Sequence, residues 1–336
     1  MSVKNRFSCV LFGRKRSGKG GNREKGYLGG FILLLLLALV FVLICREPVE
    51  EETPSPPEAV EMDAMAPDSI AEEPITAGPS YPYQIHFINV GQGDAVLIRS
   101  HDHNMLVDGG GRNSGLVKYL KELGIRKLDI VMASHPHADH IGGLIEVLET
   151  FIVYEVIDNQ VPHTTQTYNE YLTVIDRMDI PFTRGIKGLE RKMGEGAYFE
   201  ILHPRDPAGR DLNNASLVAN VSMGELNVLL TGDIEKEVER SLVKDDSLAL
   251  RAEILKVPHH GSSSSNSAAF LEAVSPRISI IMCGDDNRYG HPHTETLQWL
   301  QGMDTEVYRT DVHGTVVVSY DGEEYFVVAE RMKQGA

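Results

Sequence analysis

The sequence predicts an α+β domain in which two β-sheets pack against each other and helices flank them. Three features of residues 81–332 support this prediction. Short apolar runs are punctuated by Gly and Asp, which is typical of many short strands. Helical patterns are interspersed among these runs. The elements also fall into two similar halves, which favours a sandwich of two sheets with flanking helices.

The individual elements follow from these local patterns, and no short-period repeat accompanies them. The expected strands are Gln84–Val90, Ala95–Arg99, Asn104–Val107, Asp129–Ala133, Tyr154–Ile157, Tyr198–Leu202, Leu217–Val221, Asn227–Leu230, Ile254–Val257, Ile278–Met282, Glu306–Arg309 and Thr315–Tyr320. The expected helices are Gly115–Leu123, Gly142–Thr150, Tyr168–Met178, Lys236–Leu242, Ala268–Val274 and Thr294–Gln301.

An apolar segment ahead of the domain predicts one membrane-spanning helix over residues 27–45. Leu28–Cys45 is uncharged and approaches the roughly 20 residues needed to cross a bilayer. Residues 1–26 form a basic arm and no basic cluster follows the apolar run, so the arm is expected in the cytoplasm and the domain outside it. A cleaved signal peptide is the alternative, but its apolar core is usually only about 7–15 residues long. We expect an uncleaved, single-pass anchor in the cell membrane.

Residues 46–80 are predicted to form an extended linker between the anchor and the domain. They hold ten acidic residues, seven prolines and a single arginine. A segment of this composition cannot bury enough apolar surface to offset the entropy lost on ordering. We therefore expect it to act as a tether.

The charge of the chain argues against a broad surface for nucleic acid. The formal net charge is −16, and residues 81–336 hold 23 basic and 37 acidic residues, a balance of −14. Such a domain repels phosphate chains unless bound cations offset the charge locally. The three cysteines fall one each into the arm, the apolar segment and the domain. That distribution indicates no intrachain disulfide framework and excludes a cysteine metal cluster.

A histidine-rich turn is the strongest functional signal in the sequence. It directly follows an apolar strand and contains His135, His137, Asp139 and His140. His135 and His137 are two residues apart at a strand end, so both can face one metal ion. Asp139 and His140 continue round the turn and can face a second metal ion. Their nitrogen and oxygen atoms suit zinc, manganese or iron. A polar loop that happens to be rich in histidine is the simpler alternative, but three histidines and one carboxylate within six residues favour a metal site.

The sequence resembles the metallo-β-lactamase superfamily, whose metal signature is His-x-His-x-Asp-His. It is most similar to the metallo-hydrolase domain of the ComEC-type competence proteins. The stretches that carry this resemblance, in order, are Asn89–Ala95, Leu106–Gly110, the histidine-rich turn, Leu229–Ile234, Leu255–Ser262 and Tyr289–Pro292. The resemblance implies an αββα sandwich and two divalent metal ions. It does not extend to the multi-span channel of those competence proteins, so we do not expect this chain itself to conduct DNA.

The resemblance also implies roles for residues outside the turn. Asp233 would bridge both metal ions, although capping of the following helix is an alternative. His259 or His260 would complete the ligands of the second metal, and the sequence does not decide which. Asp108 would accept a hydrogen bond from a ligand histidine and fix its tautomer, unless it serves only the turn formed with the following glycines. The expected catalytic residues are Asp139, Asp233 and His260.

One position departs from the common pattern of the superfamily. Many members place a third histidine on the first metal, between the histidine-rich turn and the bridging acid, but this chain has Asn213 in the corresponding stretch. The only intervening histidines are His163 and His203, and His203 is interpreted as structural. The ComEC-type domains resemble this Asn-x-x-Ser stretch. We expect a weaker first metal site, with manganese favoured beside zinc.

Five further residues are candidates for supporting or substrate-binding roles. Gln92 and Asp94 lie in a Gly-flanked turn and could line the cleft, although turn geometry explains the glycines equally well. Ser262 begins a run of four serines that could contact a phosphate, but a flexible polar loop is the preferred interpretation. Tyr289 and His291 are candidates for substrate contact or for protonating the leaving group.

Together these features predict a metal-dependent hydrolase that cleaves a phosphodiester. The ComEC resemblance implies DNA or oligonucleotides as substrate, and the missing histidine disfavours a β-lactam. The metals would lower the pKa of water and polarise the scissile bond. Two alternatives remain: a surface phosphoesterase acting on choline phosphate, and a non-catalytic surface protein. The latter is disfavoured because structural zinc sites are normally closed four-ligand sets. No obligate protein partner is inferred.

Overall fold

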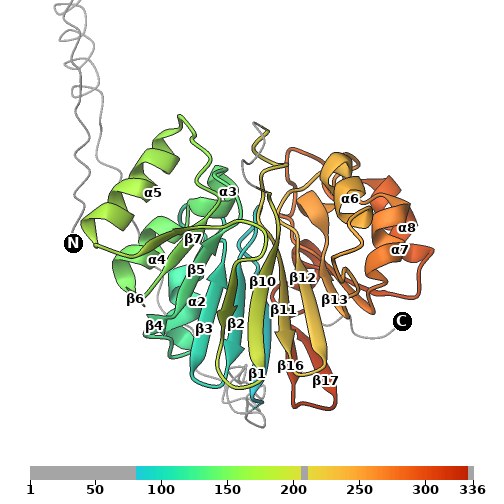
Figure 1. The fold of residues 1–336 in the computed structure, drawn as a ribbon, viewed down its shortest axis with the longest axis horizontal. Coiled ribbons are helices and arrows are strands. Elements are labelled where there is room, and N and C mark those ends of the chain that lie inside the picture. The colour runs from blue at the N-terminus through green and yellow to red at the C-terminus, as the bar shows by residue number, and fades with distance from the viewer. Residues whose placement is uncertain (1–80, 206–210, 332–336) are drawn as a thin grey trace, which may run out of the picture. The chain divides into compact units, whose positions relative to one another are not determined.

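Two β-sheets form the centre of the described domain, and helices cover the outer side of each sheet (Figure 1). The structure is a computed structural model that describes residues 81–205 and 211–331. The basic arm, the membrane anchor and the acidic linker expected in residues 1–80 lie outside the described residues. Within the described ranges, no helix is both long enough and apolar enough to cross a membrane.

The first sheet has eight strands and begins at the start of the described chain. They are β1 (Tyr83–Phe87), β2 (Val96–Ser100), β3 (His103–Val107), β5 (Ile130–Ala133), β7 (Val156–Asp158), β8 (Phe182–Arg184), β16 (Val316–Tyr320) and β17 (Tyr325–Ala329). Their order is β17-β16-β1-β2-β3-β5-β7-β8. The pairings from β17 to β3 are antiparallel, whereas β3, β5, β7 and β8 run parallel.

The second sheet has seven strands, and it also changes from antiparallel to parallel. They are β9 (Glu190–Lys192), β10 (Ala197–His203), β11 (Val218–Met223), β12 (Leu226–Leu230), β13 (Ile254–Lys256), β14 (Ile278–Ile281) and β15 (Glu306–Arg309). In the order β15-β14-β13-β12-β11-β10-β9, the strands from β12 to β15 are parallel. A separate short pair joins β4 (Lys127–Leu128) to β6 (Ile152–Val153).

The helices divide between the two outer faces. Helices α2 (Leu116–Glu122), α4 (Leu144–Thr150) and α5 (Gln166–Arg177) pack on the first sheet, and α6 (Lys236–Val243), α7 (Ala268–Val274) and α8 (Thr294–Gln301) pack on the second (Figure 1). Three single turns lie at strand ends: α3 (Ala138–Ile141), the 3₁₀ turn η1 (Pro258–Gly261) and α9 (Thr310–His313).

The strand pattern explains how one sheet serves two cores. Successive side chains of a strand point to opposite faces, so Ile98 of β2 enters the core between the sheets, while Leu97 packs under the helices. Both side chains are fully buried. Burying a side chain of this size contributes about 1.5–3 kcal/mol relative to leaving it exposed. The predicted sandwich of two sheets with flanking helices is confirmed.

Some elements differ from the sequence-based expectation. Strands β8 and β9 were not predicted because they are three residues long, polar and at sheet edges. The helix expected over Gly142–Thr150 is preceded by the separate turn α3, which begins inside the histidine-rich turn. As a result, the side chains of Asp139 and His140 project from helical backbone rather than from a loop.

The topology brings the chemically important loops together. In each sheet the parallel strands end at a common edge, and open α/β sheets bind ligands outside the carboxyl ends of such strands. Polar residues follow three of these ends: Asp108 after β3, the histidine-rich turn after β5, and Asp233 after β12. These residues meet in one site, where Asp233 lies close to His135 and His140.

A buried acid at the end of β7 provides a test of the fold by pH. Asp158 is 3% exposed, and burial raises its pKa from 3.8 to about 7, with hydrogen bonding to the Gln160 N–H offsetting only part of the effect. The folded state therefore holds this proton more tightly than the unfolded state, and stability falls as pH rises from about 4 to about 7, by on the order of 4 kcal/mol.

Asp158→Asn removes this titration, so the variant should gain stability over the parent as pH rises, with the difference levelling off above pH 7. Urea unfolding of both proteins across this pH range measures the difference. Asp176→Asn, which removes an exposed carboxylate of α5, is the matched control. A pH-independent difference for Asp158→Asn would contradict the assignment.

Candidate metal centre

The histidine-rich turn places two imidazoles side by side at the end of β5. His135 is buried and His137 is half-buried, and the Nε2 atom of His135 lies 2.8 Å from the Nδ1 atom of His137. Turn α3 begins immediately afterwards, so Asp139 and His140 project from its first turn. His140 is fully buried, while Asp139 remains half-buried at the mouth of the site.

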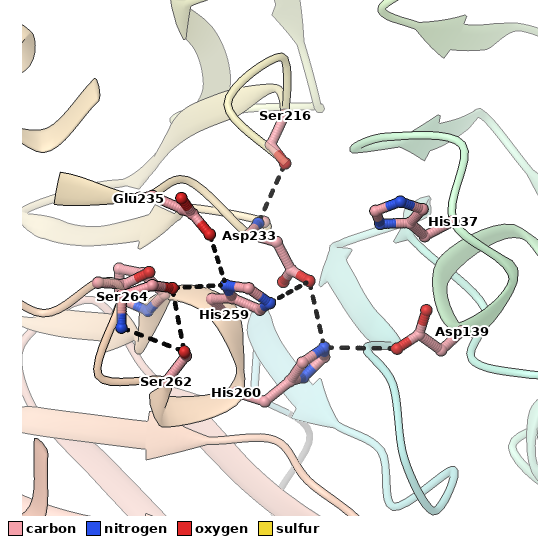
Figure 2. A network of polar contacts seen from close by, with 12 residues as sticks. His137, Asp139, Ser216, Asp233, Glu235, His259, His260, Ser262 and Ser264 are labelled. Carbon is pink, nitrogen blue, oxygen red and sulfur yellow. Dashed lines mark hydrogen bonds and ion pairs between the residues drawn. The ribbon is translucent and has the colours of Figure 1, made fainter. Parts of the chain in front are cut away.

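Asp233 is the point on which the histidines converge. Its Oδ2 atom lies 3.2 Å from Nε2 of His140, 3.3 Å from Nε2 of His260, and 3.8 Å from Nε2 of both His135 and His259. Figure 2 shows Asp233 facing His259 and His260, with Asp139 approaching His260 from the other side. The cap residue of α6 is Glu235, so Asp233 is not the N-cap that the sequence left open as an alternative.

A close approach between the two halves fixes Asp233. Gly232 has φ +51°, and a Cβ atom there would lie 2.8 Å from the side chain of Ser216 and 3.0 Å from that of Ser134. The Asp233 N–H donates to Oγ of Ser216 at 3.1 Å. Any side chain at Gly232 would separate the end of β12 from the histidine-rich turn, so this glycine is required by both space and backbone conformation.

A strained turn directs the two consecutive histidines of η1. His259 and His260 both have left-handed backbone, with φ of 50° and 54°, a conformation uncommon outside glycine. The side chain of Asn266 donates to the carbonyls of Pro258 and Ser262 and holds the turn closed. The turn brings Nε2 of His260 close to both Asp139 and Asp233, whereas His259 lies near Asp233 and is more exposed.

Hydrogen bonds set the tautomers of the two fully buried histidines. Nδ1 of His260 lies 2.8 Å from the carbonyl oxygen of Met282, and Nδ1 of His140 lies 2.9 Å from Oδ2 of Asp108. Both oxygens can only accept, so each Nδ1 carries the hydrogen and each Nε2 presents a lone pair when the ring is neutral. Neither Nε2 has a hydrogen-bond partner in the described structure. Two such orphaned nitrogens on either side of one carboxylate are what metal ligands require.

The ligand atoms fall into overlapping groups that could each hold an ion. His135, His140 and Asp233 form one group, and Asp139, His140 and His260 form another, with the ligand atoms of each group within 4.8 Å of one another. His137 adjoins the first group through His135. Carboxylate charge dominates the site: burial lowers the pKa of His260, but Asp233 and Asp94 outweigh it and raise that pKa to about 10. The same negative charge would stabilise bound cations.

The stretch that replaces the third histidine contributes no imidazole. Asn214 turns its side chain toward α6 and accepts the N–H of Glu235 at 2.9 Å, while Oδ1 of Asn213 is buried and has no hydrogen-bond partner among residues 81–205 and 211–331. Nε2 of His203 lies 2.8 Å from the carbonyl of Asn214, in agreement with a structural role. The ring of His163 lies 6.0 Å from that of His137, at the edge of the site.

The Gly-flanked turn at residues 91–94 contributes in two different ways. Asp94 is 3% exposed and belongs to the site, with Oδ1 at 3.3 Å from Nδ1 of His260. Gln92 instead accepts the N–H of Gly284 at 3.2 Å and lines a separate cavity of about 430 Å³ together with Asn113 and Arg331. Gly93 passes so close to the carbonyl of Asp139 that a Cβ atom would lie 2.1 Å from it.

A buried lysine is the main residue that the sequence-based reasoning missed. Lys256 is 2% exposed, and its Nζ atom contacts Oδ2 of Asp94, donates to the Gly232 carbonyl at 3.0 Å and lies 3.7 Å from Oδ1 of Asp233. It occupies the last position of β13, so a charged residue at the end of an otherwise apolar strand was the available signal.

The serine run after η1 corrects another expectation. Ser262 and Ser265 are 5% and 2% exposed, and Oγ of Ser265 donates to the carbonyl of Ile234 at 2.8 Å. Oγ of Ser264 lies 3.0 Å from that of Ser262 and 3.2 Å from Nδ1 of His259 (Figure 2). The interpretation as a flexible polar loop is wrong, because these hydroxyls are used to position the turn.

Tyr289 and His291 lie at the rim of the site. The His291 ring is half-buried, 5.5 Å from that of His259 and 6.0 Å from that of His260. Tyr289 is 47% exposed and stacks on His291 at 5.6 Å. His291 therefore lies beside the ligand histidines, and Tyr289 stacks on His291.

The chain is similar in sequence to known proteins. Residues 88–285 match the metallo-beta-lactamase superfamily. The chain is 30% identical over 267 residues to ComE operon protein 3 of Bacillus subtilis, covering 70% of this chain and 33% of that protein. It is 30% identical over 233 residues to competence protein ComA of Neisseria gonorrhoeae, covering 68% of this chain and 31% of that protein. The chain thus spans about a third of the length of these relatives. Among solved structures, Igni18, a metallo hydrolase of Ignicoccus hospitalis, has a TM-score of 0.46 at 15% identity, covering 70% of this chain and 99% of that one.

Proposed function

Because the chain belongs to the metallo-β-lactamase superfamily, we propose that it is a metal-dependent phosphodiesterase that cleaves single-stranded DNA or short oligonucleotides. The observation that carries the proposal is the position of the Asp233 carboxylate. One of its oxygens lies 3.2–3.3 Å from Nε2 of both His140 and His260. A carboxylate shared between two imidazole groups suits a pair of divalent ions rather than a single structural ion.

In the proposed site, the two ions would be held by His135, His137, Asp139, His140, Asp233 and His260. When bound, such ions polarise a phosphoryl oxygen and make water a nucleophile at neutral pH. Manganese and zinc fit this mixture of imidazole and carboxylate better than magnesium, which prefers oxygen ligands and keeps its waters. The absence of a third histidine would favour manganese at the first position.

The chain's own residues would orient the reaction. Asp139 is half-buried at the mouth of the site, where its carboxylate can accept a hydrogen bond from the attacking water. His291 is poorly suited to protonate the leaving group, because burial and the neighbouring histidines lower its pKa to about 4. A neutral His291 would instead donate or accept a hydrogen bond to the substrate.

The substrate assay that tests this proposal compares linear single strands, circular single strands, closed circular duplex and a choline phosphodiester. We expect the full-length chain to degrade linear single strands and short oligonucleotides fastest, with more activity in manganese than in magnesium. The domain's charge of −14 disfavours long duplex DNA, which requires an extended basic surface.

Two other results of this assay would replace the proposal. Turnover of the choline ester alone would make the chain a surface phosphoesterase. Binding of two metal ions with no turnover of any substrate would indicate a non-catalytic surface protein.

We also propose that residues 27–45 anchor the chain in the cell membrane with residues 46–336 outside the cytoplasm. The support is the uncharged apolar run preceded by the basic arm. Protease added to intact cells should cut the acidic linker and release a soluble fragment that retains the hydrolase domain. Release only after lysis would reverse the proposed orientation.

A further inference from the structure

A row of three rings leads from the metal centre to the protein surface. The rings of His260 and His291 are 6.0 Å apart with an interplanar angle of 25°, and those of His291 and Tyr289 are 5.6 Å apart at 20°. The row starts at a fully buried candidate ligand and ends at a tyrosine that is 47% exposed. Only the ring of His291 separates Tyr289 from the candidate ligand His260.

The loop that carries Tyr289 is held by its own hydrogen bonds. The side chain of Asn287 donates to the carbonyls of Gly284 and His291 at 2.9 and 2.6 Å, and accepts the N–H of His291 at 2.9 Å. Nδ1 of His293 accepts the N–H of Ser263 at 2.8 Å, which ties the end of the loop to η1. These hydrogen bonds fix the loop conformation in which Tyr289 is exposed.

A cation accompanies the exposed ring. The guanidinium carbon of Arg288 lies 4.9 Å from the centre of the Tyr289 ring, and Nη2 donates to the tyrosine hydroxyl at 2.7 Å. Tyr289 and, more weakly, the charge of Asp139 raise the pKa of the Arg288 guanidinium. Asp285 and Asp286 lie in the same loop, so this arginine can serve one phosphate but not a long anionic chain.

We propose that Tyr289 and Arg288 form a nucleotide subsite next to the metal centre, in which Tyr289 stacks on an unpaired nucleobase and Arg288 binds the adjoining phosphate. The inference rests on the proposed phosphodiesterase function and specifies its substrate class. Stacking on an aromatic ring accepts any base but requires that the base be unpaired. The subsite would thus explain a preference for single strands without a basic groove.

The same geometry argues against a choline ester. A quaternary ammonium would bind the face of an aromatic ring through its positive charge. Arg288 already places a positive charge 4.9 Å from the Tyr289 ring centre, and it would repel the ammonium while attracting a phosphate. The pairing of arginine with tyrosine therefore favours an anionic ligand that carries a flat ring.

The test measures binding and cleavage by the full-length chain and its Tyr289→Leu, Tyr289→Phe and Arg288→Gln variants. Tyr198→Leu is the matched control, because Tyr198 is 48% exposed on β10, outside the site. The probes are a fluorescent oligothymidylate and an abasic strand of the same length, with calcium used for binding without turnover. Thermal unfolding of each variant checks that it is folded.

We expect Tyr289→Leu to weaken binding of the oligothymidylate by roughly tenfold or more, the range seen for loss of base–aromatic stacking. The loss should appear in KM rather than in kcat, Tyr289→Phe should restore it, and binding of the abasic strand should not change. Arg288→Gln should weaken the binding of both the oligothymidylate and the abasic strand. Tyr198→Leu should change neither.

Equal effects of Tyr289→Leu on the two strands, or none on either, would overturn the subsite while leaving the phosphodiesterase intact. If the parent protein neither binds nor cleaves the oligothymidylate, the proposed function fails, and the subsite fails with it.

Discussion

Replacing Asp233 with asparagine is expected to abolish hydrolysis and to reduce the metal content of the purified protein from about two equivalents. Oδ2 of Asp233 lies within 3.8 Å of four imidazoles, so its charge would be shared by both ions. Changes to residues that only support metal ligands cost about 10- to 100-fold in affinity or activity. The loss at Asp233 should therefore exceed about a hundredfold.

Elemental analysis after dialysis, together with the oligonucleotide assay, measures this effect. His137→Ala should behave similarly, with the first ion lost more readily than the second. Glu237→Gln removes an exposed carboxylate from the first turn of α6 and should change neither property. Full activity of Asp233→Asn or His137→Ala would contradict the proposed centre.

Lys256→Met should cause the largest loss of stability among single substitutions in the site. Lys256 is 2% exposed and stays charged, because Asp94 and Asp233 raise its pKa against the opposing effect of burial. Removing one partner of a buried ion pair typically costs about 3–5 kcal/mol, since the other charge is left uncompensated. We expect a decrease of this size in the free energy of unfolding, measured in chelator by denaturant titration.

Two comparisons separate this electrostatic effect from a loss of packing. Added manganese should recover part of the stability of Lys256→Met, because bound cations would offset the charge of Asp233. The double variant Asp94→Asn, Lys256→Met should be less destabilised than Lys256→Met alone. If the double variant is destabilised by the sum of the single effects, the lysine contributes through packing and not through its charge.

Much of the fold and of the site could be predicted from local sequence. The membership of the metallo-β-lactamase superfamily and the relation to competence proteins, both expected from short motifs, are confirmed. The hydrogen bond from a histidine to Asp108 was also expected, and it is present at His140. These features depend on residues that are close together in the chain or that directly follow an apolar run. The apolar run predicts a strand, so the position of the residue at its end can be predicted as well.

The features that escaped prediction depend on contacts between distant segments. Lys256 owes its role to Asp94, which comes from the other half of the domain. Which of His259 and His260 is the metal ligand depends on a turn in which both have left-handed backbone, and the residue types in this stretch do not predict that conformation. The serine run was assigned to a flexible polar loop because its burial, and hydrogen bonds such as that from Ser265 to the carbonyl of Ile234, are tertiary properties.

The candidate ligands are divided between the two halves of the domain. His135, His137, Asp139 and His140 follow a strand of the first sheet, while Asp233 and His260 follow strands of the second. Each bound ion would thus act as a removable cross-link across the seam at Gly232. Protease resistance of that seam should rise on metal loading, even with no substrate present. Retention of both ions would then indicate that the two halves of the domain are still joined, since a domain that had separated along the seam could not hold both.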